Sequence, residues 1–166
     1  MFAWNKATFA VKALVVACGF AVPAASVADP LPRGAKIANP QKIAKIYSGK
    51  TELWTNNCGG GVYFAPNGQA RAWCADQGEN LGAGTWAVDA NGRMCQDLVW
   101  YYPDSGRAGA SANDRSCISH VVDRWGVVWR SWPNDPEWWP MDKNAGFVRG
   151  YKFQAQVGQT RSKLGF

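Results

Sequence analysis

Residues 60–74 read Gly-Gly-Val-Tyr-Phe-Ala-Pro-Asn-Gly-Gln-Ala-Arg-Ala-Trp-Cys, and this stretch decides the fold. Two apolar and aromatic runs, 60–65 and 69–75, flank a turn at 66–68. Proline presets the second position of a type I turn, and glycine takes the positive φ that the following bulge requires. The stretch therefore predicts an antiparallel β-hairpin.

The same turn device recurs at residues 89–92 (Asp-Ala-Asn-Gly) and 123–126 (Asp-Arg-Trp-Gly). We therefore expect two more hairpins, in which 84–89 pairs with 93–101 and 117–122 pairs with 127–132. Further short apolar runs are found at 51–56, 137–141 and 147–153. Roughly eight strands predict an all-β fold, either an antiparallel barrel-like sheet or two packed sheets.

One short helix precedes the strands, over residues 40–48. Asn39 is placed to cap it and Pro40 fits its first turn, where a missing N–H costs nothing. Apolar residues at helical spacing follow, and Gly49 is placed to end the helix in the left-handed conformation.

The N-terminus has the three parts of a secretory signal peptide. Lys6 and Lys12 precede an apolar run over 13–22, and Ser26-Val27-Ala28 forms a small-residue cleavage site. We expect residues 1–28 to be removed, which places the chain in the periplasm or outside the cell. The run is too short to span a bilayer, and no later stretch approaches that length.

A lipoprotein signal is the alternative to this cleavage. Val15-Val16-Ala17-Cys18 resembles a lipobox, in which Cys18 would carry the lipid anchor. The apolar run before Cys18 is short and hydrophobicity continues beyond it, which favours cleavage after Ala28.

The remaining chain has the length of one domain. Loss of two lysines lowers the formal charge from +6 to +4 over 138 residues, which is too weak for a nucleic-acid-binding surface. We expect a linker at 29–38, a single β-rich domain at 39–158 and a flexible tail at 159–166. Within the domain, the Gly-, Ala- and Ser-rich segment 102–116 is expected to be a long polar loop.

Four cysteines remain after cleavage, an even number that favours two disulfides in an exported chain. In the first hairpin, opposed residue numbers sum to 134, so Cys74 faces Gly60 and lies diagonal to Cys58. We expect Cys58–Cys74, and by remainder Cys95–Cys117. We expect no metal and no cofactor.

Four runs occur along the chain in a fixed order: 46–51 (Ile-Tyr-Ser-Gly-Lys-Thr), 60–68, 84–86 (Gly-Thr-Trp) and 92–95 (Gly-Arg-Met-Cys). In this order they resemble the proteobacterial domain-of-unknown-function family 995, over about residues 42–141. The resemblance implies an exported, β-rich protein and supplies no catalytic residues. The chain departs from the plainest family pattern in Cys58, Cys74, the longer 102–116 segment and an extension beyond Met141.

The sequence offers few residues that suit catalysis. The chain has no Gly-x-Ser-x-Gly elbow, and its single histidine, His120, lies within an expected strand. Glu52, Asp97 and Asp123 are conceivable glycosidase acids, but Asp123 begins a turn and the other two are expected to face solvent. We expect a non-enzymatic protein.

Tryptophan is the unusual component: the chain has 10, of which only Trp4 precedes residue 29. Trp54, Trp86 and Trp129 fall in strand patterns that suit a core. The candidate binding residues are the tryptophans of turn segments and two tyrosines nearby in sequence: Trp125, Trp132, Trp138, Trp139, Tyr101 and Tyr102.

Two functions follow from these patterns. The first is a cell-envelope binding module that recognises a saccharide through exposed tryptophans. The alternative is a protein-binding envelope accessory or enzyme-inhibitor domain that acts through the 102–116 segment, stapled by a disulfide. Carriage of a small apolar ligand inside a barrel ranks below both.

Overall fold

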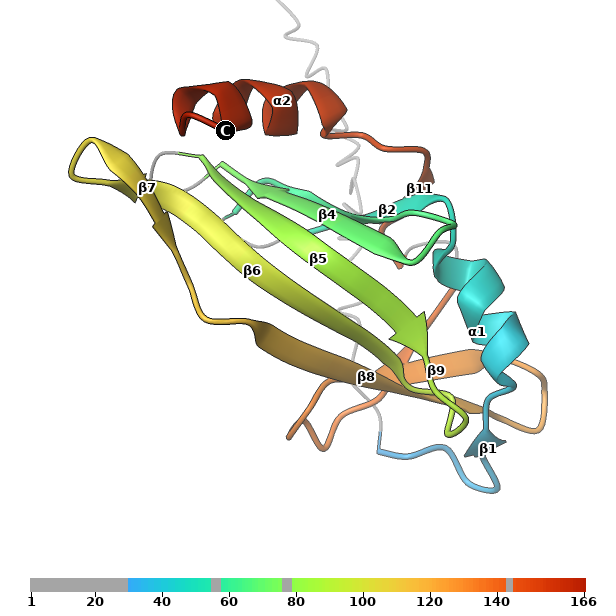
Figure 1. Cartoon of the computed structure of the whole chain (residues 1–166). Coiled ribbons are helices and arrows are strands. Elements are labelled where there is room, and N and C mark those ends of the chain that lie inside the picture. Colours follow the sequence, from blue (N-terminus) through green and yellow to red (C-terminus); the bar gives the residue numbers. More distant parts are fainter. Residues whose placement is uncertain (1–29, 55–57, 76–78, 143–144) are drawn as a thin grey trace, which may run out of the picture.

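A computed structural model describes residues 30–54, 58–75, 79–142 and 145–166 (Figure 1). The expected signal peptide at 1–28 and Cys18 lie outside the described residues. The strands are β1 (Lys36–Ile37), β2 (Lys50–Leu53), β3 (Gly61–Phe64), β4 (Gln69–Cys74), β5 (Asn80–Val88), β6 (Met94–Asp104), β7 (Arg107–Ala110), β8 (Asp114–Val122), β9 (Val128–Ser131), β10 (Trp139–Pro140) and β11 (Phe147–Arg149). The helices are α1 (Pro40–Tyr47) and α2 (Gln154–Lys163).

The strands form one antiparallel sheet that curls into a half-barrel, in the order β10-β9-β8-β6-β5-β4-β3-β2-β11. β1 adds to β8 and β7 adds to β6 off this path. The expected all-β, barrel-like antiparallel fold is thus confirmed. β2 and β9 lie near opposite ends of this strand order. The curvature of the sheet brings these two strands together, as the contact between Glu52 and Arg130 shows.

The first hairpin has the predicted register, with Gly61 opposite Trp73 and Phe64 opposite Ala70. Gly68 takes a φ of +82° at the end of the turn. The other two predicted hairpins form as β5–β6 and β8–β9. In each case the turn residues were sufficient to set which strands pair.

Helix α1 also follows the prediction. The Asn39 side chain accepts a hydrogen bond from the Lys42 N–H, and Pro40 occupies the first turn. Ile43 and Tyr47 are fully buried, so the helix packs its apolar face against the core.

The expected loop at 102–116 is instead largely β-structure. β6 continues to Asp104, and β7 returns beside it with Asp104 opposite Arg107. Ser105 and Gly106, with φ of +48° and +83°, form the two-residue connection typical of a tight hairpin. The long-loop prediction was wrong because the Ser-Gly pair was not read as a turn.

The expected tail and linker differ from the structure as well. Residues 154–163 form α2, in which Val157 and Thr160 are buried, so most of the expected flexible tail is a packed helix. Phe153 stacks on Trp73 at 5.4 Å, and the Trp73 indole N–H donates to Thr160 Oγ1 at 3.2 Å. Within the expected linker, Lys36–Ile37 pairs with β8. A helix with so little apolar patterning depends on tertiary contacts that its sequence does not reveal.

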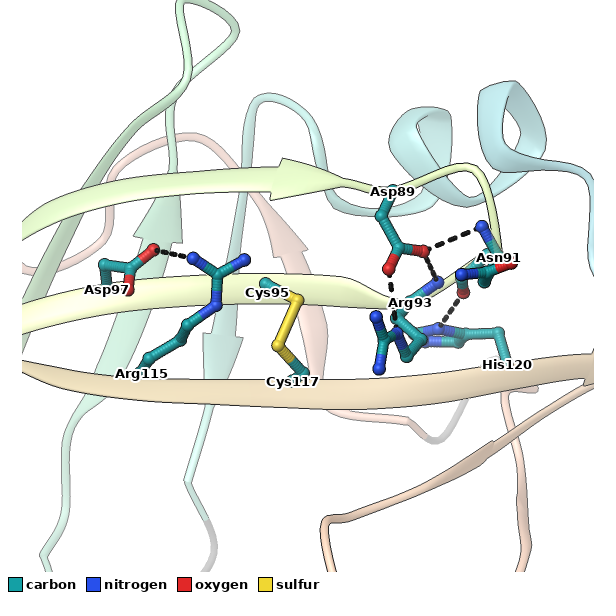
Figure 2. The surroundings of a disulfide bond; sticks show 9 residues. Asp89, Asn91, Arg93, Cys95, Asp97, Arg115, Cys117 and His120 are labelled. Carbon is teal, nitrogen blue, oxygen red and sulfur yellow. Dashed lines mark hydrogen bonds and ion pairs between the residues drawn. A yellow bond between two sulfur atoms is a disulfide. The ribbon is translucent and has the colours of Figure 1, made fainter.

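Both predicted disulfides are present, Cys58–Cys74 and Cys95–Cys117. Cys95 and Cys117 are directly opposed on β6 and β8 (Figure 2). Two positions further along the same strands, and therefore on the same face, Arg115 lies 3.6 Å from Asp97. The face of the sheet that carries these groups is called the outer face below.

The other face, called the inner face, holds the core. Its side chains come from helix α1 and from strands along the whole sheet: Ile43, Tyr47, Val62, Phe64, Ala70, Ala72, Trp86, Met94, Leu98, Ile118 and Val128. Trp54, Trp100, Trp132 and Phe147 pack against this cluster from its rim. The half-barrel interior is therefore occupied by large side chains.

Candidate functional site

The inner face contains a buried ion pair between Glu52 of β2 and Arg130 of β9. Their side chains are only 9% and 11% exposed. The Arg130 guanidinium also lies 4.5 Å from the Trp132 ring centroid and 5.7 Å from that of Phe147. Burial raises the pKa of Glu52, and the neighbouring Arg130 opposes that shift. The pair joins the two ends of the curled sheet.

A second buried polar pair, Tyr47 with His120, lies on the same face. The Tyr47 hydroxyl is 2.8 Å from His120 Nε2, and His120 Nδ1 is 3.0 Å from the Gly92 carbonyl oxygen (Figure 2 shows the second contact). Because a carbonyl only accepts, Nδ1 carries the proton and Nε2 accepts from the hydroxyl. Burial lowers the pKa of His120 to about 4 and raises that of Tyr47.

The hydrogen bonds to Tyr47 and to the Gly92 carbonyl engage both ring nitrogens of His120, which is therefore a neutral, packed residue. The three conceivable acids are also engaged separately. Glu52 binds Arg130 in the interior, Asp97 lies beside Arg115 on the outer face, and Asp123 starts the β8–β9 turn. The structure does not bring the three carboxylates together as a set. Within the described ranges, no group of three or more His, Cys, Asp or Glu side chains is arranged to hold a metal ion.

The candidate aromatic residues occupy three separate places. Trp125 stands in the β8–β9 turn with 73% of its surface exposed. Trp132 lies under Arg130, and Trp139 belongs to β10, opposite Arg130 on β9. Trp138 and Trp139 are both half-buried. The six residues therefore do not form a single platform.

The two tyrosine candidates lie far along β6 from this turn. Tyr101 packs edge-on against Phe166 at 5.0 Å, on the outer face. Tyr102, 37% exposed, belongs to the β6–β7 hairpin opposite Gly109. Trp129 was expected in the core, but it is half-buried on the outer face. Consecutive residues of a strand point to opposite faces, and its neighbour Arg130 points inward.

The β8–β9 tip, defined as residues 123–127 together with Trp129, is held by hydrogen bonds to the side chain of Asp123. The Asp123 carboxylate accepts from the N–H groups of Trp125 and Val127, each at 2.9 Å. Its other oxygen accepts from the Trp129 indole N–H at 3.0 Å. Burial acts to raise the pKa of Asp123, but these hydrogen bonds together hold it below its usual value.

Cationic and apolar groups surround the tip. The Arg124 guanidinium lies 4.2 Å from the Trp125 ring centroid, and the Lys42 ammonium donates to the Gly126 carbonyl at 3.3 Å. Val127 is 38% exposed, and Ile37 of β1, opposite Val121 of β8, is 63% exposed. The arrangement presents one large indole flanked by positive charge on a stiff turn.

Sequence reasoning found Trp125 because a tryptophan inside a turn is hard to bury. It missed the role of the Asp123 side chain in holding that turn, although aspartate at the first turn position is a recognised signal. It also missed Arg130, for which the sequence carries no signal, since its partner Glu52 lies 78 residues away.

Fold and site together define a small, disulfide-bonded half-barrel protein with an aromatic and basic turn at one end. The family model for proteins of unknown function DUF995 matches residues 13–155, so the chain belongs to the DUF995 family. No curated protein and no solved structure matches the chain. The two disulfides indicate an oxidising compartment outside the cytoplasm. Neither helix in the described parts of the chain is long and apolar enough to cross a membrane.

Proposed function

We propose that this protein is a non-enzymatic binding module of the cell envelope that recognises a saccharide through the β8–β9 tip. The observation that carries the proposal is Trp125, whose indole is 73% exposed on a turn that Asp123 holds with its side chain. An aromatic ring held rigidly outside the fold binds at low entropic cost, because its turn is already ordered. The apolar face of a sugar ring is a suitable partner for such a surface.

The charges around the tip favour an acidic saccharide. Arg124 belongs to the tip and Lys42 contacts it. Neither forms an ion pair within the described parts of the chain. Guanidinium and ammonium groups beside an indole suit a saccharide with carboxylate groups nearby. In peptidoglycan these groups lie on the peptides, and in acidic exopolysaccharides they lie on the sugars. Export by cleavage after Ala28, or lipidation at Cys18, would deliver the protein to these ligands.

Co-sedimentation with purified peptidoglycan and with acidic exopolysaccharide tests the proposal, using the chain from residue 29 with its disulfides formed. Trp125→Ala is expected to weaken binding about tenfold or more, as for a central aromatic anchor. Tyr102→Ala is the matched control, since Tyr102 is an exposed aromatic on a different hairpin. Equal retention of all three proteins, or of none on any glycan, contradicts saccharide binding at this tip.

The alternative function, capture of an envelope protein, is supported by the β6–β7 hairpin. This hairpin projects beyond the rest of the sheet (Figure 1), and the residues at its end, 103–107, are exposed. Replacing residues 103–108 by Asn-Gly shortens it while keeping Tyr102 opposite Gly109. In-cell crosslinking followed by mass spectrometry should lose a specific partner in this variant, whereas glycan binding through the tip should persist.

A further inference from the structure

A pocket lies between α2 and the outer face of β4, β5 and β6, and it is separate from the β8–β9 tip. Its volume is about 450 Å³, which is within the range of small-molecule sites. Residues of the sheet form its floor and residues of α2 its roof. The C-terminal Phe166 closes one side against Tyr101.

Small side chains create this space. Ala83 lies in the floor beside Leu81, and Gly158 lies in the roof beside Val157. A Cβ added at Gly158 would meet no atom within 4 Å, so the roof is open at this point. These parts of the floor and the roof are apolar and leave room for a compact apolar body.

Positive charge lines the same pocket. Arg71 comes from β4, directly opposite Ala83, and Arg161 comes from α2. The Arg71 guanidinium is oriented by the Ala70 carbonyl at 2.9 Å and by the Gln69 side chain at 3.0 Å. Within residues 30–54, 58–75, 79–142 and 145–166, neither arginine forms an ion pair with a carboxylate.

Tyr151 adds an unused hydrogen-bonding group. Its ring stacks on Tyr63 at 4.7 Å and lines the pocket, while its hydroxyl oxygen is buried and has no hydrogen-bond partner among the described residues. A buried hydroxyl without a partner is costly, and a bound acceptor would remove that cost. Burial raises the pKa of Tyr151, so the hydroxyl keeps its proton.

We propose that this pocket binds a small organic acid with a compact apolar body. The anionic group is received by Arg71 and Arg161 and by the hydroxyl of Tyr151. The apolar body lies over Ala83 and Leu81, under Val157. This combination of two unpaired guanidinium groups, one unpartnered donor and apolar walls matches an amphipathic anion better than a neutral or cationic ligand.

Binding of anilinonaphthalene sulfonate, an anionic aromatic probe, tests the proposal by fluorescence titration of the oxidised chain from residue 29. Displacement by 1-naphthoate is compared with displacement by 1-naphthalenemethanol, which has the same ring system without the charge. Ala83→Phe fills the floor and should abolish binding, whereas Thr85→Phe, on the same face of β5 but outside the pocket, should not. The double variant Arg71→Gln and Arg161→Gln should weaken binding about tenfold or more.

The control for lost charge is Arg149→Gln, an exposed arginine of β11 outside the pocket, which should bind as the parent does. Far-UV circular dichroism and the thermal midpoint show whether each variant folds. Gly158→Leu offers a second way to crowd the pocket, since a Cβ at this position would meet no atom within 4 Å. Probe binding that is unchanged by Ala83→Phe and Gly158→Leu, equal displacement by 1-naphthoate and 1-naphthalenemethanol, or no binding below about 1 mM probe would overturn the proposal.

Discussion

Strand β8 and the turn that follows it place polar and aromatic residues in opposite environments within a few positions. His120 is 2% exposed and bonded on both ring nitrogens, whereas Trp125 is 73% exposed. The usual preference would put the imidazole outside and the indole inside. The interior meets the cost of its polar groups with paired partners, and the tip uses a buried carboxylate to hold an apolar ring in solvent.

This contrast shows that side-chain hydrogen bonds serve different purposes in the interior and at the tip. In the interior they complete a closed core, so substitutions there should change stability. At the tip they hold the exposed Trp125 in place, so removal of that ring should change binding and leave stability nearly unchanged. Four predictions test this division, in order of decreasing effect.

The largest effect is expected from Arg130→Met. It leaves the Glu52 carboxylate buried without a cation and should cost about 3–5 kcal/mol of unfolding free energy. The pKa of Glu52, raised by burial, rises further without Arg130. Stability from a group with a raised pKa is present at low pH and lost as pH rises through that pKa, so the variant should recover in acid.

Urea unfolding at about pH 5 and pH 8 measures this recovery. The double variant Glu52→Gln with Arg130→Met should be more stable than Arg130→Met at the higher pH. If both variants lose the same stability at both pH values, an unpaired carboxylate is not the cause.

Trp86→Ala should cost about 3–5 kcal/mol, because it removes a large core side chain and leaves a cavity. The ring is 8% exposed, and its indole N–H donates to the Ala65 carbonyl at 2.8 Å. Trp138→Ala with Trp139→Ala should cost less, since both rings are half-buried at the sheet edge. Thermal unfolding compares them, and equal losses would assign the pair to the core.

His120 should make the protein acid-sensitive. Burial lowers its pKa from 6.5 to about 4, so the folded chain binds fewer protons than the unfolded chain between these values. Its contribution is complete above about pH 6.5 and is lost as pH falls toward 4, a change of about 3 kcal/mol at most. Tyr47 and Arg130 are the ionisable groups that face it.

The variant His120→Asn isolates this contribution, because asparagine does not titrate. The difference in unfolding free energy between about pH 7 and pH 4 should be smaller in the variant than in the parent. An identical pH slope in both proteins would show that carboxylates alone account for acid unfolding.

The smallest effect on stability is expected from Trp125→Ala, within about 0.5 kcal/mol, because the ring is largely in solvent. Asp123→Ala is the matched contrast. It removes the acceptor for three hydrogen bonds and should lower both stability and glycan binding. Trp125→Ala unfolding as readily as Trp86→Ala would erase the distinction between tip and interior.

Local signals in the sequence were enough to predict much of this molecule. The turns at Pro66, Asn91 and Gly126 determine three hairpins, and the register around the first turn places Cys74 near Cys58. The signal at Trp125 was also local, since a turn residue has few neighbours to bury it. The order of the whole sheet, in contrast, depends on how far the sheet curls.

The features that escaped prediction are those made by distant contacts. Helix α2 is held by burial of Val157 and Thr160 and by the hydrogen bond from Trp73 to Thr160, and its own residues show little apolar patterning. The pocket beneath it is lined by both Arg71 and Arg161, which are 90 residues apart in the sequence. No motif marks such a site, because each residue is ordinary in its local sequence.

The union of β2 with β11 also constrains the order in which the protein can fold. β2 pairs with β3 on one side and with β11 on the other, and its Glu52 forms an ion pair with Arg130 of β9. Until the last third of the chain has been made, one edge of β2 is unpaired and the Glu52 carboxylate on it has no Arg130 beside it. Closure of such long loops is slow, and exposed edges invite pairing with other chains. Incomplete chains that end before β9 should therefore aggregate, whereas in the finished chain β11 covers the exposed edge of β2.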